Sequence, residues 1–408
     1  MKNKTEKNYP KFVTLLGLYI AQSIPLSFFT TVVPVIMRQE KYSLETIGLL
    51  QLVKLPWIIK FLWAPLVDKS ALNIKGYTRW IVYSELFYAM VLIAVGFLSL
   101  QTNFILIAIL VIIAITASAT QDIATDALAV LILRKRERSI GNSMQSAGSF
   151  IGTLLGSGVL LIVYNYWGWQ ALLFGLATFV LLALIPLRLF KLKKVNETVE
   201  TKSNPIRFVD IYKFFTQKGI VKQVVLLTLF YSGIIGILTM LKPFLVDLGY
   251  SIKEIGFMSG IVGTAVAVCT SIFAGWLVRK IGMRHGAITF SMMMVITACY
   301  FFWLSTGHFN TPLIYTGIIL LWGTYGMATI IVYTTSMYYV RSGCEGTDFT
   351  IQTVLAHLGS LIFAVLSGKL AGAFEYKGLF AIEISIATIT MLYVIFIYTK
   401  DNKSLLSE

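Results

Sequence analysis

The feature that most constrains this chain is a series of long apolar runs, each about as long as a bilayer is thick. A transmembrane helix needs about 20 predominantly apolar residues, and only helices or closed barrels satisfy their backbone groups in hydrocarbon. Twelve such runs can be read along the sequence, at approximately 12–37, 45–67, 80–100, 103–133, 139–164, 167–189, 221–246, 253–278, 286–306, 311–340, 349–371 and 378–399. The pattern predicts an all-α integral membrane protein with twelve transmembrane helices.

The composition excludes a soluble protein. Hydrophobic residues make up 57% of the 408 residues and charged residues only 13%, whereas a soluble domain carries about 25% charged residues. The mean hydropathy is +0.78. The three cysteines, Cys269, Cys299 and Cys344, are widely spaced and mostly lie in apolar runs. We therefore expect neither a disulfide framework nor a metal site, and no cofactor.

The distribution of basic residues predicts the orientation in the membrane. The chain has 34 lysines and arginines and a formal net charge of +15. With both termini in the cytoplasm, 26 of these residues fall on the inner side, four on the outer side and four within the runs. Because cytoplasmic loops are enriched in Lys and Arg, both termini are expected to be cytoplasmic. Topology then explains the net charge, and nucleic-acid binding is not expected.

The two halves of the sequence resemble each other. Tyr42-Ser43-x-x-x-Ile47-Gly48 opens the second run and Tyr250-Ser251-x-x-x-Ile255-Gly256 opens the eighth. Leu66-Val67-Asp68-Lys69 and Leu277-Val278-Arg279-Lys280 end the same two runs. Two such repeats around a cleft are typical of alternating-access transporters. We expect an N-terminal six-helix bundle at 1–190, a cytoplasmic linker that can carry a surface helix at 191–219, and a C-terminal six-helix bundle with a short tail at 220–408.

Four charged residues lie deep within the predicted membrane helices. A charge in hydrocarbon costs about 2.5–3.5 kcal/mol on insertion scales, so such residues are usually paired or functional. Asp122 and Asp126 are one helical turn apart, and Lys54 and Lys60 lie in the second run. Counting about 1.5 Å per residue from the inner ends of the runs, we predict that Lys60 pairs with Asp126 and Lys54 with Asp122. The pairs form either a proton or substrate relay or permanent structural bridges.

Further polar residues in the runs complete the candidate site. Glu85 is expected to pair with a nearby cytoplasmic basic residue and to join the relay. Lys242, Lys369 and Glu383 are expected to reach the membrane interface. The candidate residues of the substrate cleft are Tyr19, Gln22, Gln121, Asn142, Gln145, Trp322, Tyr325 and Tyr333. Together they suit a bulky solute that is polar or partly aromatic.

Two predicted cytoplasmic turns resemble the signature of the major facilitator superfamily, in which Gly and Asp precede a basic pair. The second half has Gly275 to Arg284 (GWLVRKIGMR), and the first half has Ala64 to Lys69 (APLVDK), where alanine replaces the glycine. The resemblance implies two six-helix bundles around a central cleft, with Asp68 contacting either the base of the fourth helix or the eleventh helix. It implies an inner gate at Asp68, Arg134, Arg279 and Arg284.

Within that superfamily, Leu55 to Asp68 (LPWIIKFLWAPLVD) and Ala119 to Asp126 (ATQDIATD) are similar to the AmpG-like permeases. AmpG permeases import anhydro-muropeptides released from the cell wall. The compact length, Gly141 to Gly148 (GNSMQSAG) and Gly168-Trp169-Gln170 resemble a related branch, the siderophore importers of the RhtX/FptX type. The resemblance implies a proton-coupled importer, of iron-siderophores in the favoured interpretation and of anhydro-muropeptides in the alternative.

Other functional classes fit the sequence less well. Proton-coupled drug exporters of the superfamily usually carry Gly-Pro in the fifth helix, but the segment Gly152 to Gly156 has no proline. His285, His308 and His357 are scattered, and no Walker or protease motif accompanies them, which argues against an intramembrane enzyme and against ATP as the driving force. The expected partners are a small-molecule substrate, protons and the lipid bilayer. We expect a functional monomer in a bacterial cytoplasmic (inner) membrane.

Overall fold

The computed structural model describes residues 9–41, 53–71, 73–99, 101–189, 207–307 and 310–399. All regular secondary structure in these ranges is helical. The chain divides into two compact units whose segments alternate along the sequence. The first unit contains Met1–Arg134, Gly148–Ile211 and Arg341–Thr350, and the second contains Lys135–Ala147, Tyr212–Val340 and Ile351–Glu408.

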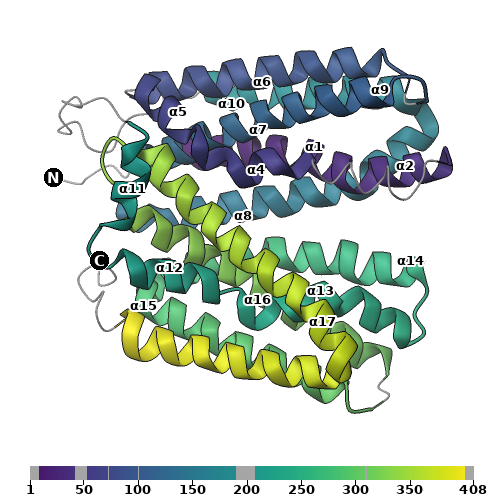
Figure 1. The fold of residues 1–408 in the computed structure, drawn as a ribbon, viewed down its shortest axis with the longest axis vertical. Helices are drawn as coiled ribbons and strands as arrows, with labels where there is room; N and C mark the ends of the chain where they lie inside the picture. The colour runs from purple at the N-terminus through teal and green to yellow at the C-terminus, as the bar shows by residue number, and fades with distance from the viewer. Residues whose placement is uncertain are drawn as a thin grey trace. The chain divides into compact units, whose positions relative to one another are not determined.

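The first unit is built around four long helices, of which α6 contacts both α7 and α9, side by side in Figure 1. A π-helical turn at Phe28–Val32 joins α1 to α2. A core of apolar side chains such as Phe28, Leu92, Ile115 and Leu173 fills the space between the helices. The described α-helices that lie wholly in this unit are α1 (Tyr9–Ser27), α2 (Val33–Gln39), α4 (Leu55–Ile59), α5 (Ala64–Ser70), α6 (Ile74–Gly96), α7 (Phe104–Ile132), α9 (Leu160–Leu182) and α10 (Leu184–Leu189).

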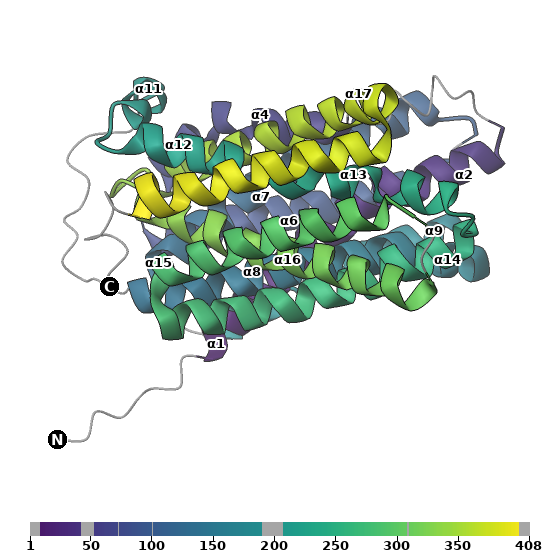
Figure 2. The same cartoon turned by 90° about the horizontal axis from the view of Figure 1, so that it is seen from below.

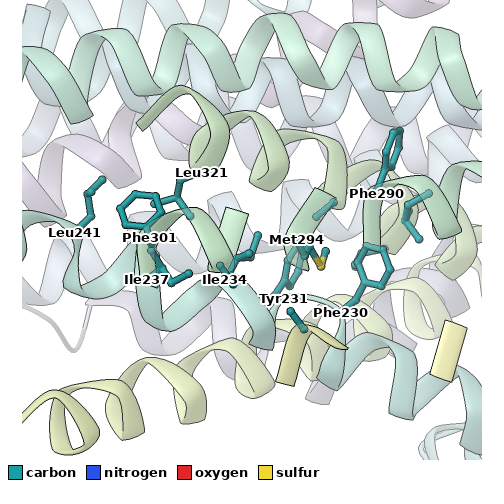
Figure 3. Packing of buried hydrophobic residues seen from close by; sticks show 14 of the residues in the cluster. Phe230, Tyr231, Ile234, Ile237, Leu241, Phe290, Met294, Phe301 and Leu321 are labelled. Carbon is teal, nitrogen blue, oxygen red and sulfur yellow. The ribbon is translucent and has the colours of Figure 1, made fainter. Parts of the chain in front are cut away.

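Helices α8 (Arg138–Leu154) and α11 (Val209–Phe215) each begin in one unit and end in the other. The second unit further contains α12 (Ile220–Leu229), α13 (Ser232–Asp247), α14 (Ile252–Ile255), α15 (Thr264–Leu304), α16 (Thr311–Tyr338) and most of α17 (Glu345–Tyr393). Helices α15 and α16 pack against each other, and they lie side by side in Figure 2. In Figure 3, Ile234, Ile237 and Leu241 of α13 pack against aromatic and apolar side chains of α15 and α16.

Two of the long helical segments each contain two transmembrane spans. Eight helical segments in the described residues are long and apolar enough to cross a membrane, including Lys253–Leu304 with 52 residues and Glu345–Tyr398 with 54. At about 1.5 Å per residue, either one would be more than twice as long as the hydrocarbon is thick, about 30 Å. A residue with positive φ interrupts each, Gly282 (82°) and Glu375 (58°), and α17 turns back at this point in Figure 1.

A third interruption, at Gly168 (φ 75°), separates the predicted fifth and sixth spans. Glycine tolerates this left-handed conformation because it has no Cβ atom. The observed helix bounds therefore follow the predicted runs closely. The Tyr42 to Gly48 motif, residues 45–52 of the second run, most of the predicted linker (190–206) and His308 lie outside the described residues.

Candidate functional site

The first unit brings together a lysine, an aspartate and a glutamine from three separate segments. Lys60 Nζ forms an ion pair with Asp122 Oδ2, and Gln22 Nε2 donates a hydrogen bond of 2.7 Å to Asp122 Oδ1. Lys60 is 1% exposed and Asp122 is 3% exposed. Lys60 Nζ also lies 4.7 Å from the centre of the Trp57 ring, within the range of a cation–π contact. Both charges are thus buried with the partners that a buried charge requires.

The predicted pairing of the membrane charges is wrong. Lys60 pairs with Asp122 rather than Asp126, and Lys54 is exposed and forms no ion pair with any described residue. Helix α4 gives way to a 3₁₀ turn at Lys60–Leu62. Such a turn rises about 2.0 Å per residue instead of about 1.5 Å, and the lysine stem is long and flexible. The turn adds about 1.5 Å over its three residues, and the flexible stem spans the remaining distance to Asp122, one helical turn from the predicted partner.

Asp126 lies one turn further along α7 and has a different partner. The Tyr19 hydroxyl donates a hydrogen bond of 2.6 Å to Asp126 Oδ1, and both residues are buried. Tyr19 and Gln22 are three residues apart on α1 and therefore share one helix face. A single face of α1 thus contacts both carboxylates of α7.

The same side of α7 carries further buried polar groups. At about 100° per residue, one sector of about 140° contains Ser118, Gln121, Asp122, Thr125 and Asp126. Among the described residues, hydrogen-bond partners are lacking for Ser118 Oγ, Thr125 Oγ1, both amide atoms of Gln121, and Gln22 Oε1 of α1. Because buried polar groups are normally satisfied, this face offers donors and acceptors to a polar ligand or to ordered water.

Glu85 on α6 is buried, and the prediction that it pairs with a cytoplasmic basic residue is wrong. Its side chain is 2% exposed, Oε1 has no hydrogen-bond partner, and no described basic residue forms an ion pair with it. Helix α6 begins at Ile74, six residues before the predicted start of this span. Glu85 therefore lies about 16 Å along the helix axis from the start of α6. At this depth it is out of reach of the basic side chains at the start of the helix.

Asp68, predicted at the inner gate, binds the first residues of α17. The backbone N–H groups of Gly346 and Thr347 donate hydrogen bonds of 2.9 and 2.7 Å to its carboxylate, and the Thr347 hydroxyl donates one of 2.7 Å. The Tyr77 hydroxyl donates another, of 2.6 Å. Burial raises the pKa of Asp68 to about 6, against the opposing effect of these hydrogen bonds. Of the two contacts expected for Asp68, the structure shows the one with the eleventh span.

The arginines predicted at the inner gate belong to different units. Arg134 is an exposed residue of the first unit. Arg279 and Arg284 belong to the second unit, where Arg279 is exposed and Arg284 is half-buried with no partner for its Nε atom. Arg341, which the sequence did not single out, forms a two-point ion pair with Asp348 at 2.6 and 2.8 Å.

In the second unit, the first half of α8 contacts α16 through polar side chains. Asn142 Nδ2 donates a hydrogen bond of 3.2 Å to Thr334 Oγ1, and the Ser146 hydroxyl donates one of 2.7 Å to Thr329 Oγ1. Asn142 Oδ1 has no partner among the described residues. Gln145, on the same half of α8, is buried as well.

The aromatic candidates of α16 form a cluster that includes a residue the sequence did not single out. The Tyr325 ring lies 5.7 Å from the Tyr231 ring and 6.3 Å from the Trp322 ring, measured between ring centres. The Trp322 indole packs against Gly263 of a π-helical turn, and its Nε1 atom has no described partner. Tyr333 follows further along α16.

Of the three residues predicted at the membrane interface, Lys242 and Lys369 are exposed. Glu383 is 2% exposed, so the prediction is wrong for this residue. Gly236 of α13 lacks the Cβ atom that would overlap the Glu383 carboxyl group. The carboxyl group therefore fits between helices instead of extending to the interface.

Four further residues belong to these sites: Trp57, Tyr77, Thr347 and Tyr231. Only Trp57 could have been found from the sequence. Trp57 precedes Lys60 by three residues, a spacing that places two side chains on one helix face. Tyr77 and Thr347 meet Asp68 through the tertiary fold, and Tyr231 lies between the end of α12 at Leu229 and the start of α13 at Ser232.

A bundle of membrane helices with an ion pair buried among them is typical of polytopic membrane transporters. The profile of the Major Facilitator Superfamily matches residues 13–348, and the chain belongs to this family. Its expected twelve-helix, all-α fold is the norm of the family and is confirmed. The chain is a multi-pass membrane transporter and not an enzyme.

Several relatives are named as AmpG-type permeases, as the sequence motifs predicted. The putative transporter AmpG 3 of Rickettsia prowazekii (strain Madrid E) is 26% identical over 98% of this chain and 97% of that protein. The anhydromuropeptide permease of Escherichia coli (strain K12) is 21% identical over 98% of this chain and 83% of that protein. These relatives support the muropeptide alternative better than the siderophore interpretation.

Solved structures share the fold at low sequence identity. A bacterial homologue of the iron transporter ferroportin, in an outward-facing state with soaked iron, has a TM-score of 0.69 at 18% identity and covers 94% of this chain and 98% of its own. The human organic anion transporter MFSD10 has a TM-score of 0.71 at 12% identity, and the match covers 95% of this chain and 98% of that chain. At these identities the likeness concerns the fold alone.

Proposed function

We propose that this protein imports anhydro-muropeptides, or closely similar polar solutes, across a bacterial cytoplasmic membrane by proton-coupled alternating access. The sequence similarity to an anhydromuropeptide permease supports the substrate class. The buried Lys60–Asp122 pair supports the coupling, and it is the observation on which the proposal chiefly rests. The excess of basic residues in the predicted inner loops supports cytoplasmic termini, and one chain with both repeats suffices as a functional monomer.

In the proposed mechanism, the substrate competes with Asp122 for Lys60. The peptide part of a muropeptide carries carboxylates, and one of them takes the Lys60 ammonium group from Asp122. A buried carboxylate without its cation is costly, so Asp122 then takes up a proton. When the substrate leaves, Lys60 returns to Asp122 and the proton is released. Substrate and proton binding are thereby linked through one pair of side chains.

The neighbouring groups suit the sugar part of such a solute. Gln121 and Gln22 offer unpartnered amide atoms beside the ion pair, and an amide binds sugar hydroxyl and acetamido groups as donor and acceptor. The Trp57 ring offers an apolar face next to Lys60. The cleft candidates of the second unit, Asn142, Gln145, Trp322, Tyr325 and Tyr333, remain proposals for further substrate contacts.

Uptake of a radiolabelled anhydro-muropeptide tests the proposal, in bacteria that lack their own permease and express this chain. We expect accumulation that collapses when a protonophore is added. Asp122→Asn abolishes accumulation, while Lys253→Gln, a change at an exposed lysine outside the candidate site, leaves it unchanged. Accumulation by Asp122→Asn at the wild-type level would exclude the coupling role of Asp122. If the same cells take up iron-siderophores instead of muropeptides, the substrate is a siderophore, as the sequence interpretation favoured.

A further inference from the structure

A second buried carboxyl group lies in the second unit and has no part in the Lys60–Asp122 mechanism. Glu383 is 2% exposed, and its Oε2 atom has no hydrogen-bond partner among the described residues. The turn at Glu375 divides α17 into a first arm, which precedes it, and a second arm, which follows it. Glu383 lies on the second arm, eight residues after the turn. This distance corresponds to about 12 Å along the helix, which places the carboxyl group well inside the predicted span.

Three helical segments shape the space that the Glu383 side chain occupies. A Cβ atom on Gly236 of α13 would overlap Glu383 Oε1 and would lie 3.1 Å from the Cβ atom of Ser367. Ser367 lies on the first arm of α17, eight residues before the turn, and therefore at the same depth as Glu383. One turn away, a Cβ atom on Gly233 would lie 2.6 Å from the Cα atom of Ala387. The two glycines thus bring the bare backbone of α13 against the arm that carries Glu383.

No cation neutralises Glu383 among the described residues. The charged or titratable side chains on α13 and on the part of α17 within the second unit, apart from two tyrosines, are Lys242, Asp247, His357, Lys369, Glu375 and Lys377, and all of these are exposed. Asp247 accepts a hydrogen bond of 2.7 Å from Tyr376. Glu383 forms no ion pair with any of them. An isolated carboxylate inside a membrane helix bundle is costly, whereas its protonated form is neutral and can donate a hydrogen bond.

We propose that Glu383 is a second proton-binding site of this transporter, which opens and closes as α13 moves against α17. The helix is interrupted just before α13, because α12 ends at Leu229 and α13 begins at Ser232. Interrupted helices of this kind form the ion sites of many transporters. With Gly236 against the carboxyl group, the proton is shielded. When α13 moves away, water reaches Glu383 and the proton is exchanged.

The use of this site in transport rests on the proposed proton coupling, but proton binding by Glu383 can be measured without transport. Infrared difference spectra of the purified protein in lipid nanodiscs, recorded over a pH titration, report the C=O stretch of protonated carboxyl groups. We expect a protonated band at neutral pH that disappears in Glu383→Gln and persists in Glu375→Gln, a change at an exposed carboxyl group on the same helix. A spectrum of Glu383→Gln identical to that of the wild type would overturn the proposal.

Transport then tests the role of the bound proton. We expect Glu383→Gln to reduce gradient-driven accumulation at least tenfold while keeping substrate exchange without a gradient within about twofold of the wild type. Gly236→Ala, which places a methyl group where the carboxyl group lies, should shift the Glu383 band in the infrared spectrum. Normal accumulation by Glu383→Gln, or a carboxyl band that depends on sodium instead of pH, would exclude the site. If the wild type transports no muropeptide, the infrared titration still decides whether Glu383 binds a proton.

Discussion

At the scale of single residues, the Lys60–Asp122 pair that carries the proposed transport chemistry should also contribute to the stability of the fold. Removing one partner of a buried ion pair leaves an uncompensated charge and costs about 3–5 kcal/mol. We expect Lys60→Ala and Asp122→Ala each to destabilise the protein by this amount, and the double variant to lose clearly less than the sum. Denaturant unfolding of the purified protein in detergent measures the cycle. Lys54→Ala, at an exposed lysine of the same predicted span, is the control with little expected change, and strictly additive losses would argue against the pair.

Asp68 gives the protein a pH dependence of a predictable sign. Burial raises its pKa to about 6 from the ordinary value of 3.8, so the folded protein keeps a proton that the unfolded chain has lost. The stabilising contribution is therefore complete below pH 3.8 and is lost as the pH rises through 6. At 1.36 kcal/mol per pKa unit, it amounts to about 3 kcal/mol.

Unfolding at two pH values measures this contribution. The wild type should gain about 1 kcal/mol in free energy of unfolding at pH ~5 relative to pH ~7.5 through this residue. Asp68→Asn should lose that gain, whereas Glu375→Gln, at an exposed carboxyl group, should keep it. A wild type that gains no more than Asp68→Asn on acidification would show that Asp68 titrates near its ordinary pKa.

At the scale of elements, two glycines of α8 and one in the π-helical turn that follows it, Leu155–Val159, set the distance to α1. Cβ atoms added to Gly148 and Gly152 would lie 2.8 Å from Tyr19 Cβ and 2.5 Å from Ser23 Cβ, and one on Gly156 would overlap the carbonyl oxygen of Ile24. Since overpacking costs about 1–3 kcal/mol, Gly156→Ala should lower the melting temperature in detergent. Gly175→Ala has nothing within 4 Å of the new Cβ atom and should raise it through helix propensity. Equal shifts in both variants would contradict the close packing.

The sequence predicted where helices begin and end better than which of their side chains meet. The fourth and tenth spans were predicted at 103–133 and 311–340 and are observed at Phe104–Ile132 and Thr311–Tyr338, because hydropathy records the length of a span. The partner of Lys60 depends on a 3₁₀ turn that hydropathy does not record. The burial of Glu383 depends on Gly236, which is far away in the sequence.

At the scale of the whole molecule, the family was predictable and the substrate branch was not. The stretches Leu55 to Asp68 and Ala119 to Asp126, which carry the resemblance to the AmpG-like permeases, contain both members of the Lys60–Asp122 pair and the neighbouring Trp57. The features that favoured siderophore import were the chain length, the Gly141 to Gly148 stretch and Gly168-Trp169-Gln170. In the structure, that stretch contributes helix contacts such as Asn142 with Thr334, which say little about the solute.

The distribution of basic residues alone predicts the orientation of the molecule, with both termini in the cytoplasm. With 26 basic residues in the predicted inner segments and four in the outer ones, the turn after the ninth span should face outward and the turn after the tenth inward. Alkaline phosphatase fused after Gly307 should be active and after Gly343 inactive, and green fluorescent protein should give the opposite pattern. Both fusion points follow the same nine spans, so they differ by the tenth alone. A reversed pattern would place both termini outside and would make the contact of Asp68 with α17 an outer gate, which the proposed import mechanism does not allow.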